Sequence, residues 1–337
     1  TARPRRRRAR PARRSRSVRR VSAPPFLDAA AVAALLSPTA AVDALEAALR
    51  AGLDPEADPP RTAVPADGGE LLLMPSTSAH AAGVKLVTVA PGNPARGLPR
   101  IQGVYVLLDP ATLAPALLLD GIALTNLRTA AVSALAVRHL AAPGARRLLL
   151  FGTGPQAWAH VAALRAERPI AQIDVVGRDA DRRAAFAERC ADAGAGVAAE
   201  PVAPGPAVAA AVRAADLICC CTTAREPLFD GALVADHATV VAMGSHEPGA
   251  REVDERLAGR ATVVVEARAS ALREAGDVIA AIRAGALEPG ALVTLDALVR
   301  GEATPAPGRP RLFKSTGMAW EDAVVAAAVS ARASPAR

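Results

Sequence analysis

The chain of 337 residues is 51% apolar but only 2% aromatic, so it can bury the core of two domains and must build that core from Ala, Val and Leu. Its formal net charge of +7 arises from eleven arginines within residues 1–20, without which the remaining chain carries −4. The sequence therefore predicts no basic surface for nucleic acid on the folded body. It also contains no uninterrupted run of about 18 apolar residues, the length that a membrane span needs. We expect a soluble, cytoplasmic protein.

Residues 1–20, TARPRRRRARPARRSRSVRR, form a low-complexity segment without acidic residues. Such a composition predicts disorder. The segment is either an arm for an anionic surface or an extension that the folded body does not need, and we favour the second interpretation. No apolar stretch long enough for a secretory signal follows the arginines.

Residues 21–143 predict a first domain that opens with two helices. Asp28 and the Ser37-Pro38 pair are helix-start signals, which predict helices over residues 29–36 and from residue 38 to about residue 52. A proline-rich segment and four strand-like runs follow, with Gly, Asn and Pro turns that indicate an antiparallel meander. These runs cover residues 70–74, 83–90, 101–109 and 115–120. A helix is predicted from about Thr125 to Leu140.

From Pro143-Gly144 onward, short apolar strands alternate with helices. The strands are RRLLLF, IDVVG, DLICCCT, ATVVAMG and ATVVVEA. This alternation is typical of a doubly wound parallel sheet, so the predicted fold class is α/β. The alternating region ends at a Pro/Gly-rich linker near residues 305–310, and we expect the last segment to return to the first domain.

The strongest local motif follows the first of these strands. The strand runs directly into a turn and then a helix, and the turn comprises Gly152, Thr153, Gly154, Pro155, Gln156 and Ala157. The first glycine permits the tight turn, the second lets the backbone approach a pyrophosphate, and Ala157 is small enough for close packing of helix and strand. The free N–H groups of the helix N-terminus favour phosphate. The motif predicts a dinucleotide site in a Rossmann-type domain.

The second strand of this region ends at Gly177, followed by Arg178 and Asp179. NAD-dependent dehydrogenases usually place Asp or Glu at that strand end to bind the ribose 2′-OH. Gly177 removes this carboxylate, and Arg178 is suited to a 2′-phosphate. The sequence therefore favours NADP, while Asp179, two residues further on, keeps NAD open.

The cysteines predict no metal site. They are Cys190 and the run Cys219–Cys221, which lies in an apolar strand. Adjacent cysteines do not have zinc-ligand spacing, and the five histidines show no paired spacing either. We interpret the cysteines as small apolar residues of a reduced core.

Lysine occurs only twice among forty basic residues, as Lys85 and Lys314. Arg replaces Lys easily on a solvated surface, but not where a compact ammonium of adjustable pKa is needed. Lys85 lies in a predicted strand, Arg61 lies upstream, and Arg128 is placed in the first turn of the predicted helix. Two arginines and a lysine can bind a carboxylate, and the neighbouring cations would lower the pKa of the lysine enough for proton transfer.

Five motifs in this order resemble the ornithine cyclodeaminase/mu-crystallin family, and the resemblance runs from Leu27 to the C-terminal helix. The motifs are LLLMPSTSAHAAGVKLVTVAPGNPARGLP, ALLLDGIALTNLRTAAVSALAVRHLA, GTGPQA, GSHEPGAREVD and FKSTGMAWED. The resemblance implies a homodimer. Residues 21–143 and 312–337 would form its discontinuous substrate and dimerisation domain, and residues 144–311 its NAD(P)-binding domain.

Residue by residue, the resemblance implies that Arg61, Lys85 and Arg128 bind the substrate carboxylate, with Lys85 also catalytic. Thr316 is expected beside the nicotinamide as a substrate contact, and Lys314 is expected to be structural or a neighbour of the cofactor. The remaining implied cofactor contacts, besides the glycine turn, are Gly177, Arg178, Thr222, Met243 and Ser315.

Two departures from the family pattern affect the expected reaction. His246, in GSHEP, stands where ornithine cyclodeaminases carry a catalytic Asp, and Glu247 is displaced by one position. Gly177 stands where the cyclodeaminases carry a cofactor-binding Asp. Both changes favour an NAD(P)H-dependent reductase of an imino acid such as Δ1-pyrroline-2-carboxylate, with His246 as a second catalytic group. Ornithine cyclodeaminase, an alanine-type dehydrogenase and a mu-crystallin-like binding protein remain the alternatives.

Overall fold

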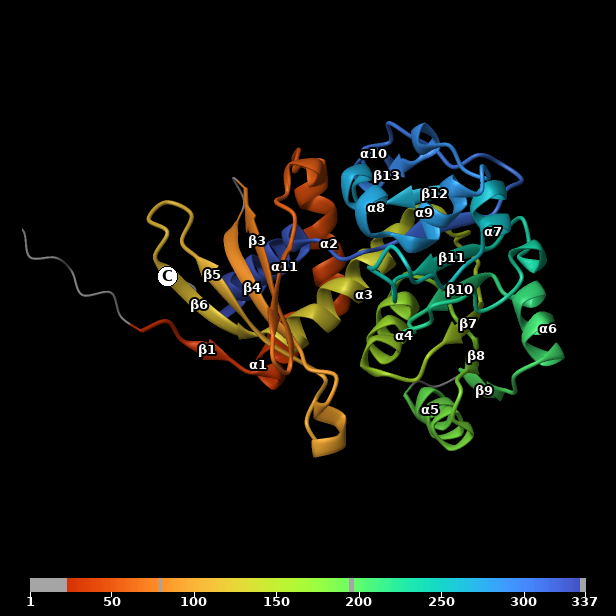
Figure 1. Ribbon diagram of the computed structural model, residues 1–337, viewed down its shortest axis with the longest axis horizontal. Coiled ribbons are helices and arrows are strands. Elements are labelled where there is room, and N and C mark those ends of the chain that lie inside the picture. The colour runs from red at the N-terminus through yellow and green to blue at the C-terminus, as the bar shows by residue number, and fades with distance from the viewer. Residues whose placement is uncertain (1–22, 79–80, 194–196, 334–337) are drawn as a thin grey trace, which may run out of the picture.

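The computed structural model describes residues 23–78, 81–193 and 197–333, so the arginine-rich segment lies outside the described residues. The chain builds two sheets, which stand side by side in Figure 1 with helix α3 (Gly121–Leu140) running between them. The first and last parts of the described chain both belong to the half with the smaller sheet.

The smaller sheet has six strands in the order β1-β6-β5-β4-β3-β2. Strand β1 pairs with β6 in parallel, and the other neighbours are antiparallel, as the predicted meander requires. The strands are β1 (Phe26–Leu27), β2 (Thr62–Ala66), β3 (Gly69–Thr77), β4 (Ala82–Val89), β5 (Ile101–Leu108) and β6 (Pro115–Asp120). Strand β2 was not predicted, because its proline suggested a loop; as an edge strand it tolerates Pro65.

The helices of this half are α1 (Ala29–Leu35), α2 (Pro38–Arg50), α3 and α11 (Ala319–Ala333). The predicted caps are present: Asp28 accepts from Ala31 N and Ser37 from Ala40 N. Helix α3 begins four residues earlier than predicted, because the side chain of Asp120 caps it. Arg128 therefore lies about two turns into the helix, and the prediction of a first-turn position was wrong.

The larger sheet has eight strands, all parallel, in the order β13-β12-β14-β11-β10-β7-β8-β9. The predicted α/β class and doubly wound sheet are confirmed. The strands are β7 (Arg147–Phe151), β8 (Gln172–Val176), β9 (Ala198–Val202), β10 (Leu217–Cys220), β11 (Thr239–Ala242), β12 (Thr262–Val265), β13 (Val293–Thr294) and β14 (Arg311–Lys314).

Strand β14 corrects one predicted domain boundary. It lies between β11 and β12 in the larger sheet, so the chain returns to the smaller sheet only after Lys314 and not from residue 312. The helices along this half are α4 (Pro155–Glu167), α5 (Ala180–Asp192), α6 (Pro206–Ala214), α7 (Glu255–Arg260), α8 (Arg268–Glu274), α9 (Gly276–Arg283) and α10 (Leu295–Val299). Short 3₁₀ turns are η1 (Pro55–Ala57), η2 (Asn93–Arg96), η3 (Gly231–Leu233) and η4 (Pro289–Ala291).

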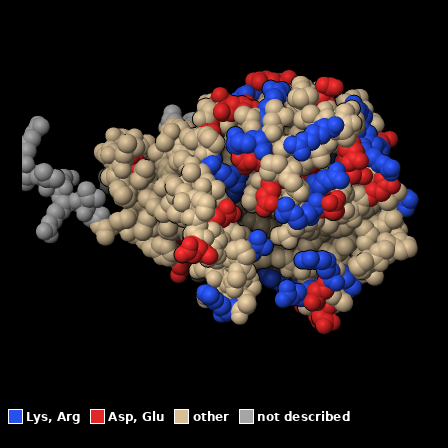
Figure 2. All heavy atoms as spheres, in the orientation of Figure 1, with Lys and Arg blue, Asp and Glu red and all other residues tan. Residues whose placement is uncertain are grey.

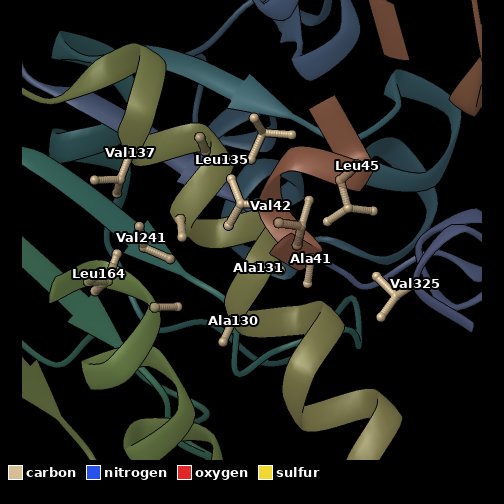
Figure 3. Packing of buried hydrophobic residues seen from close by; sticks show 14 of the residues in the cluster. Ala41, Val42, Leu45, Ala130, Ala131, Leu135, Val137, Leu164, Val241 and Val325 are labelled. Atoms are coloured by element: carbon tan, nitrogen blue, oxygen red, sulfur yellow. The ribbon is translucent and has the colours of Figure 1, made fainter. Parts of the chain in front are cut away.

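One continuous core joins the two halves around α3. Figure 3 shows Ala41 and Val42 of α2 against Ala131 of α3, with Leu164 of α4 on another side of the same helix. Most side chains of α3 after Arg128 are buried, and alanines are frequent among them, so neighbouring helices approach closely. Helix α3 is thus a rigid support between the two sheets.

Two of the cysteines lie near a buried histidine that links α3 and α4. The ligand atoms of His160, Cys219 and Cys221 lie within 4.8 Å of one another. His160 donates from Nδ1 to Gln156 O at 2.8 Å, which leaves Nε2 to accept from the Ser133 hydroxyl at 2.9 Å. Both ring nitrogens therefore already have partners, and we interpret the group as core packing.

Among the described residues, no single helix has the length and apolar character needed to cross a membrane. Only α1 and α2 taken together, bent by 72° at their junction, meet that criterion, by length and composition alone.

Candidate functional site

Three basic side chains from separate elements converge near the start of α11. We call Arg61, Lys85 and Arg128 the cation cluster. Lys85, in β4, is 1% exposed and donates from Nζ to Oδ1 and Oδ2 of Asp322 at 3.0 and 2.8 Å. Arg128 donates from Nε to Oδ1 of the same carboxylate at 3.1 Å. One buried carboxylate of α11 thus serves two cations.

The second acid of α11, Glu321, pairs with Arg128 and not with Lys85. Glu321 Oε2 accepts from Arg128 Nη1 at 2.6 Å, and the residue is fully buried. Burial and the nearby carboxyl of Glu266 raise the pKa of Glu321 well above its usual value. Burial thus favours the protonated form of Glu321, and Asp322 is the carboxylate that pairs with both Lys85 and Arg128.

Arg61 connects the cation cluster to the loop between β14 and α11. Its Nη2 donates to the carbonyl oxygens of Thr316 and Gly317 at 2.8 and 2.7 Å, and it pairs with Glu274 at 2.8 Å. Gly317 has φ +74°, and a Cβ there would lie 2.6 Å from Arg128 Nη1. Only glycine fits this position, because the backbone conformation and the guanidinium both exclude a side chain.

Buried charges displace two pKa values in this region. The pKa of Lys85 falls to about 8, because burial and the charges of Arg128 and Arg61 outweigh the opposing effect of Asp322. Asp58, which accepts from Trp320 N at 2.8 Å, has its pKa raised to about 6, chiefly by burial. Tyr105 lies opposite Lys85 on β5, and its hydroxyl has no hydrogen-bond partner within the described part of the chain.

His246 lies on the loop after β11, exposed and within electrostatic reach of Arg61. The protein around the loop desolvates the imidazole, and together with Arg61 it lowers the pKa of His246 below its usual value. Glu247, the displaced acid, pairs with Arg225 at 3.1 Å on the surface. Lys314 braces this loop: it donates to Ser245 O at 2.7 Å and pairs with Asp277 at 2.9 Å. Both of these contacts of Lys314 are with protein groups.

The glycine turn borders a cavity of about 870 Å³ at the carboxyl ends of the parallel strands. Gly152 has φ +114°, and a Cβ there would lie 2.5 Å from Cys221 O, so this position requires glycine. Gly154 precedes α4, and no described atom lies within 4 Å of the place where its Cβ would be. The open side of Gly154 leaves the N-terminus of α4 accessible to an anion.

One wall of this cavity consists of Gly177, Arg178 and Arg182. Asp179, the residue that kept NAD open, uses its side chain to accept from Arg182 N at 2.9 Å and so caps α5. Two arginines therefore border the cavity at the end of β8, and the acidic residue among the cavity's lining residues is Asp230, at the start of η3. Arg182 is a lining residue that the sequence did not single out.

Two buried glutamates fix the strand-end loops between the cavity and the cation cluster. Glu266 accepts from the Ser315 and Thr316 hydroxyls at 2.6 and 3.1 Å. Glu252 accepts from the Thr222 hydroxyl at 2.7 Å and from Gly244 N at 2.7 Å. The hydroxyls of these predicted contacts are thus already bonded to protein, although Thr222 still lines the cavity.

Two further predicted contacts lie close to the same loops. Gln156 donates to Asn126 Oδ1 at 3.0 Å, and its own Oε1 is buried with no partner among the described atoms. The N–H of Met243 donates to Cys220 O at 3.2 Å, which ties β11 to β10. A cavity at a glycine turn, an open helix N-terminus and a buried amide oxygen without a partner fit a dinucleotide.

The structure adds acids that the sequence analysis did not assign, namely Asp58, Glu266, Glu274, Glu321 and Asp322. Glu321 and Asp322 lie within the motif FKSTGMAWED, which was noticed without assigning them roles. Two adjacent acidic residues in a motif of an apolar helix were the sequence signal that could have pointed to partners for the cation cluster.

Comparisons with known proteins match the chain to one family. The family model "Ornithine cyclodeaminase/mu-crystallin family" matches residues 23–336. The Δ1-pyrroline-2-carboxylate/Δ1-piperideine-2-carboxylate reductase of Azospirillum brasilense is 39% identical over 259 residues, which cover 76% of this chain and 81% of that protein. Δ1-Pyrroline-2-carboxylate reductase 2 of Burkholderia ambifaria is 37% identical over 302 residues, with coverages of 88% and 92%.

A solved structure extends the similarity to three dimensions. The Δ1-pyrroline-2-carboxylate reductase of Thermococcus litoralis, in complex with NADH and L-proline, aligns with a TM-score of 0.84. The two chains are 28% identical, and the alignment covers 91% of this chain and 97% of that one.

Proposed function

The chain belongs to the ornithine cyclodeaminase/mu-crystallin family, and from this premise we propose that it is an NADPH-dependent reductase of small cyclic imino acids of the Δ1-pyrroline-2-carboxylate type. The observation that carries the proposal is Lys85, a buried ammonium between two arginines with a pKa of about 8. Such a group remains protonated at neutral pH and yet releases its proton readily.

The cation cluster supplies binding and proton transfer. Arg61 and Arg128 bind the substrate carboxylate and orient the ring, and Lys85 donates a proton to the imine nitrogen. A bound nicotinamide cofactor supplies the hydride that the imine carbon accepts, so that C=N becomes CH–NH. Glu321 contacts Arg128 from α11, and burial favours its protonated form, which would leave the guanidinium charge available to a substrate carboxylate.

We propose a secondary role for His246. Its lowered pKa keeps the imidazole neutral at pH 7, so it suits a hydrogen bond to the substrate or a relay of protons to Lys85 better than direct donation. Glu247 is engaged with Arg225, which supports the view that the displaced acid does not replace the Asp of cyclodeaminases.

We propose that the turn residues 152–157 contact the cofactor together with Thr222, Met243 and Ser315. All of them lie at or just after the carboxyl ends of parallel strands, where the cavity opens. The family's neighbours bind nicotinamide cofactors, and for this chain we propose NADP over NAD. Arg178 and Arg182 line the cavity where a 2′-phosphate would need cations, and Asp179 is occupied as a helix cap. A 2′-phosphate gains two charge-assisted contacts there, whereas a neutral 2′-OH gains less from two cations.

A panel of substrates with both cofactors tests the function. We expect oxidation of NADPH with Δ1-pyrroline-2-carboxylate and Δ1-piperideine-2-carboxylate, and a lower kcat/KM with NADH. Ammonia release from ornithine without net oxidation of cofactor would identify a cyclodeaminase instead. Formation of reduced cofactor from alanine alone would identify an alanine-type dehydrogenase, and tight cofactor binding without turnover would identify a binding protein.

We also propose that the chain forms a homodimer through the outer face of the smaller sheet. That face, opposite to Lys85, is apolar and partly exposed, and Figure 2 shows that the surface of this half bears far fewer charges than the other. Its side chains are Leu71, Leu73, Val84, Leu86, Val104, Val106 and Leu118. Leu86→Glu should yield a monomer by light scattering, whereas Leu98→Glu, an exposed residue outside this face, should leave a dimer.

A further inference from the structure

Asp322 is the only carboxylate that contacts Lys85 among the described residues. Both of its oxygens accept from the ammonium, at 3.0 and 2.8 Å, and one of them also accepts from Arg128 Nε. The side chain of Asp322 is fully buried. Because both side chains are buried away from solvent, this contact acts on Lys85 more strongly than a surface ion pair would.

We propose that Asp322 is a positioning residue for the reaction: its carboxylate fixes the direction of the Lys85 ammonium and supplies the negative charge that lets this ammonium persist beside two guanidinium groups. The inference rests on the proposed function, in which Lys85 is the proton donor. Asp322 itself does not touch the substrate in this account.

The hydrogen-bond geometry explains the positioning. An ammonium has three N–H donors, and the two contacts with Asp322 use two of them. The third donor remains for a ligand on the side away from α11. Without Asp322 the four-carbon side chain would lose the contacts that select its rotamer.

The charges around Lys85 explain the need for a counterion. The groups that face it are Arg61 before β2, Arg128 on α3, Tyr105 on β5, Asp322 on α11 and, through Asp322, Asp58 after η1. The guanidinium groups lower the pKa of Lys85, whereas the carboxylate of Asp322 raises it. Glu321 is next to Asp322 in sequence, but it contacts Arg128 and not Lys85, so it cannot take over this contact.

The presence of only two lysines permits a direct measurement. Lysine labelled with ¹³C at Cε gives two NMR signals, which Lys85→Met assigns, and each signal titrates with its own ammonium. In the wild-type protein the Lys85 signal should titrate near pH 8. In Asp322→Asn its midpoint should fall by about 1–3 pH units, while the Lys314 signal stays in place. An unchanged midpoint for Lys85 would refute the proposal.

Glu321→Gln is the matched control, because it makes the same isosteric change one position earlier on α11. Glu321 contacts Arg128 and not Lys85, so the Lys85 midpoint should move much less than in Asp322→Asn. A fall as large as that in Asp322→Asn would contradict a specific role for Asp322.

A second variant, for which the Lys85 midpoint is expected to shift in the opposite direction, keeps the test decisive even if Asp322→Asn fails to fold. Arg128→Met removes a cation that competes for Asp322, so the Lys85 midpoint should rise above the wild-type value. A midpoint that stays or falls would overturn the assignment of Asp322 as the counterion.

Kinetics then separate this inference from the proposed function. The alkaline limb of kcat/KM should move to lower pH in Asp322→Asn together with the NMR midpoint, with a loss of about tenfold or more at pH 8. The titration needs no substrate. A wild-type protein that reduces no imino acid would refute the function alone, whereas active protein with an unmoved Lys85 midpoint would refute the role of Asp322 alone.

Discussion

One guanidinium nitrogen of Arg61 donates to the carbonyl oxygen of Gly317 at 2.7 Å, although 256 positions separate the two residues in sequence. The loop that contains Gly317 is the connection by which the chain leaves the larger sheet and returns to the smaller one. The arginine proposed to bind the substrate therefore also holds the crossing between the two halves.

Arg61→Met should raise KM for Δ1-pyrroline-2-carboxylate by about 10- to 100-fold, because a charge-assisted contact to the carboxylate is lost. The melting temperature should also fall, since Thr316 and Gly317 lose a donor. Steady-state kinetics and thermal unfolding measure the two effects. Arg100→Met, at an exposed arginine, serves as the charge control, and an unchanged KM in Arg61→Met would exclude the residue from the site.

Gly154→Ala should leave the free protein about as stable as the wild type while weakening NADPH binding tenfold or more. Its Cβ would meet no described atom within 4 Å, but it would point into the space that a pyrophosphate needs. Gly152→Ala should instead destabilise the fold, because its Cβ would lie 2.5 Å from Cys221 O. Calorimetry and thermal unfolding compare the pair; equal effects on stability would contradict the described turn.

Arg178→Ala combined with Arg182→Ala should raise KM for NADPH about tenfold or more and change KM for NADH little, because only NADPH carries the 2′-phosphate. Arg189→Ala is the control on the same helix, since Arg189 lies over the Trp158 ring and not in the cavity. Tighter binding of NADH than NADPH by the wild-type protein would reject the proposed cofactor preference.

His246→Ala should reduce kcat less than tenfold near pH 7, whereas Lys85→Met should abolish turnover. The lowered pKa keeps His246 neutral at this pH, so it contributes a hydrogen bond or a relay and not the donated proton. If His246 were the acid, its loss would cost about 10²-fold. A kcat measured from pH 5 to 9 distinguishes the two roles.

Asp58→Asn should change how stability depends on pH. The pKa of Asp58 is raised in the folded state, to about 6 from an ordinary value of 3.8, so the fold binds this proton more tightly than the unfolded chain does. Its contribution is fully present below pH 3.8 and is lost as the pH rises through 6, by up to about 3 kcal/mol. Relative to wild type, Asp58→Asn should therefore gain stability between pH 4 and pH 7 in urea unfolding; a constant difference would contradict the raised pKa.

The sequence predicted the features that depend on neighbouring residues. Asp28 and Ser37 cap helices through contacts three positions away, and the strand, turn and helix around Gly152 form one local unit. Strand β14 could not be assigned, because its place between β11 and β12 depends on partners more than 45 positions away. Strand β9, AAEPV, lacks the alternation that marks a strand.

The cation cluster shows the same division. The basic residue types at Arg61, Lys85 and Arg128 indicated a carboxylate site, but the acids that hold them come from α8 and α11. Asp322 lies 237 positions from Lys85, and nothing in the spacing of the two residues indicates that they meet. Ion pairs between residues so far apart in sequence can be identified only from the folded structure.

Both lysines are about 1% exposed, and each lies in the middle or at the end of a strand in a different sheet. A protease that cleaves only after lysine therefore finds no accessible site in the native protein and cuts only molecules that have opened. Cleavage after Lys85 reports opening of the smaller sheet, and cleavage after Lys314 reports opening of the larger one. Because the chain has only two lysines, the sizes of the fragments from such a digest show which half of the protein unfolds first.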